Sequence, residues 1–169
     1  MSSSVKRSAE ADGAAETQVV LERFLPYRLS VLASLTSQAL AQIYAERFGL
    51  TIPAWRVVAT LGQYGVVTAR DISLHAVMHK STVSRAVSQL QERGLIVRKP
   101  NREDRREENL ELTGAGRAVY EAVVPEALAF EQRLVSVLTP AEQRGFMTVL
   151  HKLDRQARQL AALPGAEAP

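Results

Sequence analysis

The sequence predicts a mainly helical protein with a small β-wing: a winged helix-turn-helix between N-terminal and C-terminal helices. Three observations lead to this fold class. Aromatic residues make up only 5% of the 169 residues, whereas Leu, Ala and Val are abundant, a composition typical of helices rather than a β-sandwich. Apolar residues recur at three- and four-residue steps through most of the chain. Two short strand-like runs flank one charged tip, as in a β-hairpin.

Length and composition exclude several classes of protein. A chain of 169 residues favours one domain, and the absence of cysteine excludes disulfides, thiolate metal ligands, a thiol nucleophile and a cysteine redox sensor. The first 16 residues lack the apolar core of a secretory signal, and no apolar run approaches the ~18 residues of a membrane span. We therefore expect a cytoplasmic protein with no membrane partner, a mobile tail over 1–18 and a frayed end over 163–169.

The first half of the chain predicts two helices. Residues 20–48 form a long amphipathic helix, in which Pro26 either introduces a kink or marks a new start in the first turn. Gly49 suits a left-handed cap that ends this helix. Thr51 then caps a second helix that runs to about residue 63.

A short helix and a longer one follow, separated by a tight turn. Thr68 and Asp71 form a variant of the capping box and open the short helix, which ends at about residue 77. The longer helix spans about 80–93 and stops at Gly94. Its inner stripe is apolar (Val83, Val87 and Leu90), and its outer face is small, polar and basic. Such a face suits a helix that lies against phosphates and base edges.

The last part predicts a hairpin and two helices. Residues 95–100 and 108–113 read as strands around a charged tip, with Leu110 and Leu112 alternating so that one face points inward. Thr113 caps a helix to about residue 137, and the sequence Thr139-Pro-Ala-Glu142 is a capping box that opens a final helix to about residue 162.

The positive charge of the chain is concentrated in one stretch. The formal net charge is +3, but residues 80–106 hold eight basic and three acidic side chains, a net charge of +5, so the remainder carries −2. A solvated charged face would explain this, and so would an element that binds a polyanion. The two central helices and the hairpin favour the second interpretation, because a helix fits the major groove, about 12 Å wide, while wing arginines reach the minor groove.

Four motifs at this spacing resemble the MarR family of bacterial transcription regulators: Lys80-Ser-Thr-Val-Ser-Arg85, Leu90-Gln-Glu-Arg-Gly-Leu-Ile96, Asp104-Arg-Arg106 and Leu112-Thr-x-x-Gly116. The resemblance covers about residues 20–162. It implies a winged helix-turn-helix over 50–113 and dimerisation helices over 19–48 and 114–162. It also implies a homodimer that binds a pseudo-palindromic operator in double-stranded DNA and releases it when a small anionic or phenolic molecule binds. His79 departs from the family, which often has an Asp or Ser cap at this place.

The outer face and the resemblance together predict the DNA contacts. These are Lys80, Ser81, Thr82, Ser84, Arg85, Ser88 and Gln89 on the recognition helix, and Arg105 and Arg106 on the wing. The resemblance implies that Arg106 enters the minor groove and that Asp104 orients the wing arginines. The final helix bears an apolar stripe (Phe146, Val149, Leu150, Leu153 and Leu160) that exceeds what one intramolecular partner would cover, so we expect a symmetric dimer.

Arg28 provides a hypothesis about the effector. It falls on or beside the apolar stripe of the first helix, where a charge is costly unless it is paired. It either forms a salt bridge, to Glu22 or across the dimer, or binds an anion, as the resemblance to members that sense aromatic acids implies. A guanidinium binds a carboxylate bidentately, and an attached ring would rest against Phe24, Tyr27 or Trp55, with His75 nearby. Trp55 also suits a core position. The second reading predicts a repressor released by an aromatic or heteroaromatic carboxylate, linked to aromatic catabolism or stress.

Three other functions compete with this one. An architectural DNA binder without an effector is the main alternative. A metal sensor would use Asp71, His75 and His79, which stand four residues apart, but the helix should end before His79, so we expect no metal. An enzyme is disfavoured because no nucleophile–base arrangement, phosphate loop or HExxH motif is present, and no cofactor is expected.

Overall fold

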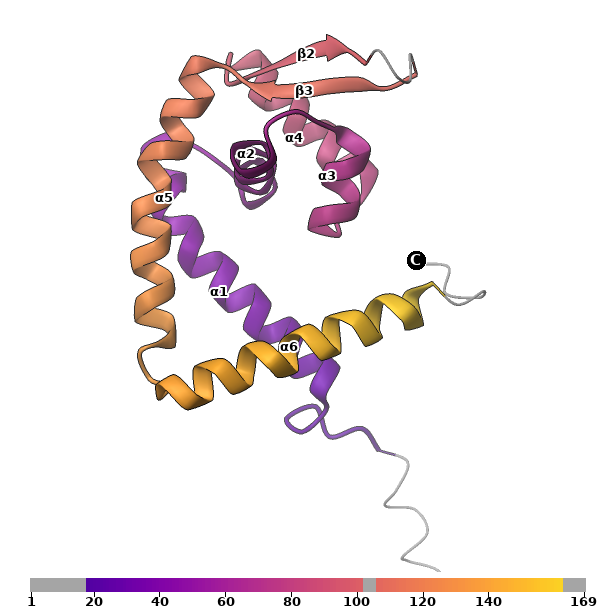
Figure 1. The fold of residues 1–169 in the computed structure, drawn as a ribbon, viewed down its shortest axis with the longest axis vertical. Coiled ribbons are helices and arrows are strands. Elements are labelled where there is room, and N and C mark those ends of the chain that lie inside the picture. Colours follow the sequence, from indigo (N-terminus) through magenta and orange to yellow (C-terminus); the bar gives the residue numbers. More distant parts are fainter. Residues whose placement is uncertain (1–17, 102–105, 163–169) are drawn as a thin grey trace, which may run out of the picture.

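The computed structural model describes residues 18–101 and 106–162. The elements are α1 (Leu25–Phe48), α2 (Ile52–Tyr64), β1 (Val67–Thr68), α3 (Ala69–Ala76), α4 (Lys80–Glu92), β2 (Ile96–Pro100), β3 (Glu108–Leu112), α5 (Gly114–Val135) and α6 (Pro140–Ala161). Figure 1 shows α2, α3, α4 and the sheet gathered at one end, with α6 and the start of α1 at the other. The long helices α1 and α5 connect the two ends.

The sheet has three strands rather than the two of the expected hairpin. β2 and β3 pair antiparallel, with Ile96 opposite Leu112, and β1 adds to the other edge of β3, with Val67 opposite Leu110. Leu110 is buried and Leu112 half-buried, so the expected inward face of β3 is present. β1 was missed because two residues are too few to show an alternating pattern.

Local capping residues fix the helix boundaries. α1 begins at Leu25, with Pro26 in its first turn, so the proline marks a start rather than a kink and the expected start near Val20 was wrong. Gly49 ends α1 with φ 58°, in the left-handed region. The expected capping boxes of α3 and α6 are both present. In the first, hydrogen bonds from the backbone N–H and the hydroxyl of Thr68 hold the pKa of the Asp71 carboxyl below its usual value.

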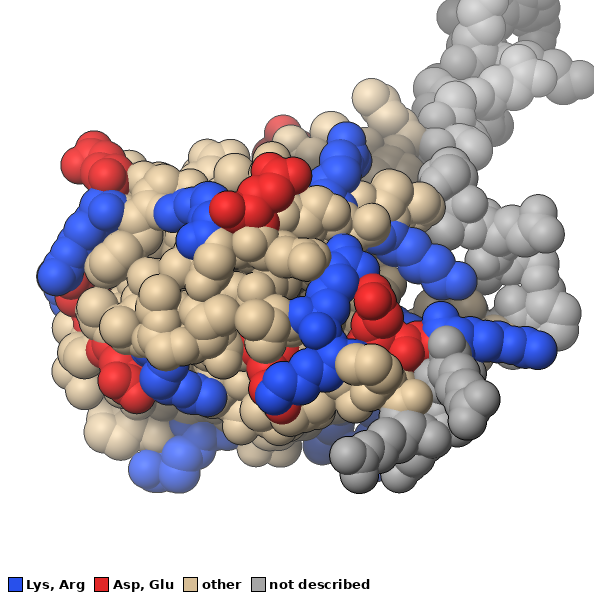
Figure 2. Space-filling model, turned by 90° about the horizontal axis from the view of Figure 1, so that it is seen from above, with Lys and Arg blue, Asp and Glu red and all other residues tan. Residues whose placement is uncertain are grey.

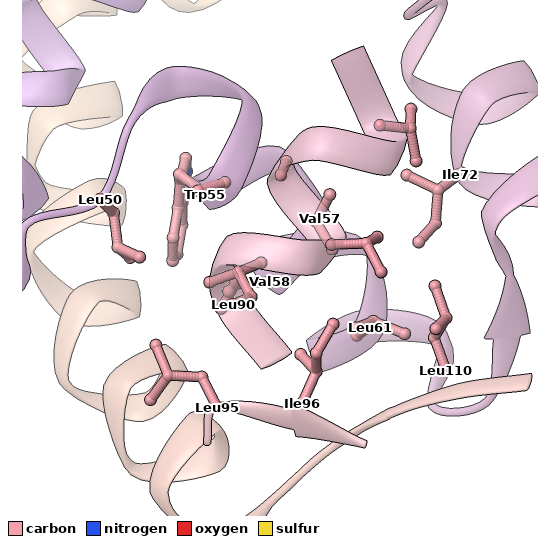
Figure 3. Close-up of a cluster of buried hydrophobic side chains, with 14 of the residues drawn as sticks. Leu50, Trp55, Val57, Val58, Leu61, Ile72, Leu90, Leu95, Ile96 and Leu110 are labelled. Atoms are coloured by element: carbon pink, nitrogen blue, oxygen red, sulfur yellow. The ribbon is translucent and has the colours of Figure 1, made fainter. Parts of the chain in front are cut away.

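The hydrophobic core lies between α2, α3, α4 and the sheet (Figure 3). Val57, Val58 and Leu61 of α2 are fully buried, as are Ile72 of α3 and Leu90 of α4. These side chains pack against the apolar inner stripe of α4 on its side away from solvent. The expected inner stripe is therefore confirmed.

An aromatic stack joins the long helices to this core. The rings of Tyr44 (α1) and Trp55 (α2) have centroids 5.3 Å apart, and those of Trp55 and Tyr120 (α5) are 6.4 Å apart. Trp55 is only 8% exposed, so it occupies the core position that the sequence allowed. Burial raises the pKa of the Tyr44 hydroxyl, and the positive charge of Arg56 partly offsets this increase.

The far end of the molecule is sparsely packed. No residue of α6 is buried, and Phe146, Val149, Leu150 and Leu160 are exposed while Leu153 is half-buried. The first turns of α1 are likewise exposed, including Leu25, Leu32 and Leu35. This exposure confirms the expectation that the apolar stripe of α6 is larger than the surface that the rest of the chain covers. Contiguous apolar surface of this kind marks an interaction site.

The turn between α3 and α4 contains a strained residue, which gives a stability prediction. Val77 has φ 48° and ψ 51°, a left-handed conformation that is costly for a β-branched side chain, and it is 77% exposed. We expect Val77→Gly to stabilise the protein by about 1 kcal/mol, because relief of strain exceeds the added entropy of the unfolded chain. Denaturant unfolding measures the change.

The matched control is Val137→Gly. Val137 is also highly exposed in a turn, but it has no positive φ. Val137→Gly should destabilise the protein by about 0.5–1 kcal/mol. Equal effects of the two substitutions would contradict the assignment of strain to Val77.

Candidate nucleic-acid interface

The recognition helix α4 begins with an unusual cap. His79 is the N-cap residue, and its Nδ1 accepts a hydrogen bond from the backbone N–H of Ser81 at 3.3 Å and lies 2.8 Å from the Ser81 hydroxyl. The imidazole therefore takes the role that an Asp or Ser side chain usually plays. This sets the start of α4 at Lys80 and settles the boundary that the sequence left open.

The outer face of α4 is polar and accessible. Lys80, Ser81, Ser84, Arg85 and Gln89 are exposed, and Thr82 and Ser88 are half-buried. Nε of Arg85 donates to the carbonyl oxygen of Ser81 at 3.3 Å, and Arg85 forms no ion pair with an acid of the described residues. None of the seven predicted helix contacts is buried: five are exposed, and Thr82 and Ser88 lie half-buried toward the flanks of the apolar stripe.

The wing carries less net positive charge than the sequence suggested. Arg98 pairs with Glu108 at 2.7 Å, and Lys99 pairs with Glu111 across the strands. These glutamates follow directly after the basic stretch that ends at Arg106, so counting charges to that residue left them out. Figure 2 shows the result: Lys and Arg are interspersed with Asp and Glu rather than gathered into one basic patch.

The wing tip is only partly described. Arg106 is exposed, in the turn that leads into β3. Asp104 and Arg105, expected to orient the wing and to contact DNA, lie outside the described residues.

Tertiary packing adds Arg70, which the sequence analysis missed, and places Arg98, counted there only as part of the basic stretch, beside α4. A hollow of about 280 Å³ between α3, α4 and the sheet is lined by Arg70, Lys80, Ser84, Arg98 and Glu107, together with Ala69 and Val87. Arg70 lies 3.9 Å from Glu107. Arg70 stands ten residues before the basic stretch, so no charge run pointed to it. These cations extend the charged surface from α4 onto its neighbours.

The five predicted effector residues do not come together within one chain. Trp55 and His75 line a hollow of about 250 Å³ together with Arg56, Ala59, Thr60, Gln63 and Ala76. Phe24, Tyr27 and Arg28 lie exposed at the start of α1. Tyr44 is the α1 residue that contacts Trp55, and at 1.5 Å per residue it stands about 24 Å along the helix from Arg28.

Arg28 and Arg56 have different surroundings. Among the described residues Arg28 forms no ion pair, so the first of the alternatives, a bridge to Glu22, is absent. Arg56 lies beside the hollow and donates to the Ser37 hydroxyl of α1 at 3.5 Å. Sequence analysis missed Arg56, although its place directly after Trp55 was a usable signal.

The described residues hold no group of three His, Asp or Glu side chains able to bind a metal ion. Asp71 is engaged by Thr68, the His75 ring packs edge-on against Tyr64 at 4.9 Å, and His79 caps α4. Within the described ranges, none of the helices combines the length and the apolar composition needed to cross a bilayer.

Comparison with known proteins decides the family. Residues 48–107, from the last residue of α1 to the residue before β3, match a family model described as MarR family. A crystal structure of a MarR family transcriptional regulator from Silicibacter pomeroyi is 30% identical with a TM-score of 0.71, covering 81% of this chain and 91% of that one. The chain belongs to the MarR family. It is therefore a DNA-binding transcription regulator with the winged helix-turn-helix fold, and its relatives are regulators rather than enzymes.

Two further comparisons bear on regulation. The transcriptional repressor IacR of Pseudomonas putida is 29% identical over 113 residues, which are 64% of this chain and 68% of IacR. The structure of BpsR from Bordetella bronchiseptica, whose DNA binding is regulated by 6-hydroxynicotinic acid, is 25% identical with a TM-score of 0.63. It covers 75% of this chain and 98% of BpsR.

Proposed function

We propose that this MarR-family regulator is a dimeric repressor that binds a pseudo-palindromic operator and is released by an aromatic or heteroaromatic carboxylate. The observation that carries the DNA-binding part is the outer face of α4, whose predicted contact residues are all accessible over a packed inner stripe. The repressor role is supported by the similarity to IacR.

The uncovered apolar surface supports the dimer. The exposed stripe of α6 and the exposed first turns of α1 lie at the same end of the molecule, remote from the winged domain (Figure 1). A second copy that covers this end by a two-fold axis leaves both α4 helices accessible. Their separation would then match one turn of DNA, about 34 Å, so that each reads one half-site of an inverted repeat.

Arg85 and Arg106 should differ in what they contribute to DNA binding. Arg106→Ala should weaken binding to all duplexes and reduce the slope of log affinity against log salt by about one, because one phosphate contact is lost. Arg85→Ala should relax base preference, at about 1–3 kcal/mol for a lost bidentate contact. Fluorescence anisotropy over a salt series measures both, with a duplex that the wild-type protein selects from a random library.

The control is Lys152→Ala, which removes an exposed cation of α6, far from α4. It should leave base preference unchanged. Unaltered affinity, salt slope and preference in both Arg85→Ala and Arg106→Ala would refute α4 and the wing as the DNA-reading surface.

The hollow beside Trp55 is the best-supported place for the effector. It offers an aromatic ring, an imidazole and the Arg56 guanidinium, the three kinds of group that hold an aromatic carboxylate. That BpsR responds to an aromatic acid agrees with this ligand class. Arg28 would reach such a ligand only if a second copy brought its α1 to the hollow. Such a ligand releases DNA by binding more tightly to a dimer whose α4 spacing does not fit the operator.

Two substitutions separate the roles of the arginines. Benzoate, salicylate and nicotinate derivatives, titrated from micromolar to millimolar concentration, should raise the melting temperature of the wild type and release its DNA. Arg56→Ala should retain DNA binding and lose the response. Arg28→Ala should lose it as well if the partner copy completes the site, and should keep it otherwise.

If both variants still respond, neither guanidinium binds the carboxylate. If no carboxylate in the panel shifts the melting temperature of the wild type, the effector proposal fails and the architectural alternative is favoured.

A further inference from the structure

Arg93 joins two elements that are far apart in the sequence. It is the C-cap residue of α4, and its guanidinium donates to the carbonyl oxygen of Phe48, the last residue of α1, and to that of Gly49 at 3.2 Å. α1 and α4 otherwise share very little contact. The side chain therefore forms a direct polar link between a long N-terminal helix and the recognition helix.

The chemistry of this link suits an arginine. The last carbonyls of a helix lack intrahelical donors and carry the negative end of the helix dipole. A planar guanidinium offers several donors in a fixed geometry, so one side chain can satisfy two neighbouring carbonyls and resist rotation about either bond. Arg47, in the last turn of α1, is directed elsewhere: it pairs with Glu126 of α5 at 3.1 Å.

The N-cap of α5 is also hydrogen-bonded to the turn that follows α4. The hydroxyl of Thr113, the N-cap of α5, donates to the carbonyl oxygen of Gly94 at 2.7 Å, and the Thr113 N–H donates to that of Leu95 at 3.0 Å. Residues 93–95, directly after the recognition helix, are thus bonded to both long helices. The aromatic stack of Tyr44, Trp55 and Tyr120 adds attraction between the same units, but ring stacking constrains rotation less than directional hydrogen bonds do.

We propose that Arg93 is a positioning residue that fixes the angle of α4 relative to α1, and with it the operator half-site spacing that the dimer accepts. This inference rests on the proposed dimeric function. The buried stripe of α4 packs against α2 and α3, so these helices would move as one unit relative to α1. α4 has 13 residues and is about 20 Å long, so a 10° rotation of this unit about the Arg93 end displaces the start of α4 by about 3 Å, close to the rise of one base pair. The Arg93 side chain reaches across the junction to Phe48 and Gly49, and only its backbone N–H bonds to a predicted DNA contact, at the carbonyl oxygen of Gln89. Arg93 would therefore control spacing without reading a base.

The test selects duplexes from a random library with the full-length wild type, Arg93→Ala and Arg93→Lys. The wild type should enrich inverted half-sites at one spacing, and one added base pair between them should weaken its binding about tenfold. Arg93→Ala should enrich the same half-site sequence over several spacings and tolerate the added base pair with less than about a threefold loss. Arg93→Lys, whose ammonium can serve the carbonyls without a fixed plane, should fall between the two.

Arg47→Ala is the matched control, because it removes an arginine from the same corner but one that contacts α5 and not α4. It should keep the spacing of the wild type. A single unchanged spacing in Arg93→Ala, or equal broadening in Arg47→Ala, would overturn the role of Arg93. If the wild type enriches no inverted repeat, the proposed dimeric operator fails first, and the inference falls with it.

Discussion

The double substitution Phe146→Glu and Leu150→Glu should convert the proposed dimer into a monomer and lower operator affinity by about 10² to 10⁴. The two side chains are one helical turn apart on the exposed apolar stripe of α6. Two copies packed through this stripe would bury four unpaired carboxylates, which apolar contacts cannot offset. The monomer then holds one half-site and loses the effective concentration with which the second α4 engages the other.

Light scattering at micromolar concentration and anisotropy on the selected duplex measure the two effects. No α6 residue belongs to the buried core, so circular dichroism should show a folded winged domain. The control places glutamates on the opposite side of α6, as Arg144→Glu and Arg155→Glu, and should remain a dimer. A dimeric Phe146→Glu/Leu150→Glu variant would rule out this stripe as the interface.

Gly116→Ala should be the most destabilising single substitution considered, at about 3 kcal/mol or more. A Cβ at this position would lie 2.0 Å from the carbonyl oxygen of Leu95 and 3.2 Å from Cδ2 of Leu112. The first neighbour is backbone at the turn that Thr113 also holds, so the clash is relieved only by moving α5 away from the end of α4. Thermal unfolding should show a decrease in melting temperature of about 10 °C.

Gly114→Ala is the matched control in the same helical turn. A Cβ there meets no atom within 4 Å, and alanine favours a helix, so stability should be unchanged or slightly higher. A wild-type melting temperature for Gly116→Ala would show that α5 does not depend on this close approach. It would also weaken the view that residues 93–95 are a rigid junction.

The local features of the fold were readable from the sequence because each depends on neighbours in the chain. The capping boxes at Thr68 and Thr139 need only a hydroxyl and a carboxylate three residues apart. The inner stripe of α4 needs only helical periodicity, and the polar outer face follows as its complement. Pro26 allowed two interpretations, and the start of α1 at Leu25 selected one.

The features that were missed involve partners distant in the sequence. β1 pairs with a strand about 40 residues later, and Glu108 and Glu111 neutralise wing cations across the hairpin. The effector hypothesis placed Arg28 near Trp55, but a straight helix separates them by a distance that periodicity alone does not reveal. The arginine that lines the hollow with Trp55 is instead Arg56, the next residue of α2, because α2 packs against α1 and α3.

The sequence by itself determined the winged helix-turn-helix, the polar outer face of α4 and the excess apolar surface, because local hydrogen bonds and helical periodicity encode them. Only the tertiary structure decided which charges are paired, which aromatic rings stack, and how the end of α4 is held. Arg93 illustrates the difference: in the sequence it is one more basic residue in a charged stretch, and in the fold it caps a helix that ended 45 residues earlier. A side chain that satisfies distant carbonyls leaves no periodic signal, because its role is set by packing and not by its neighbours in the chain.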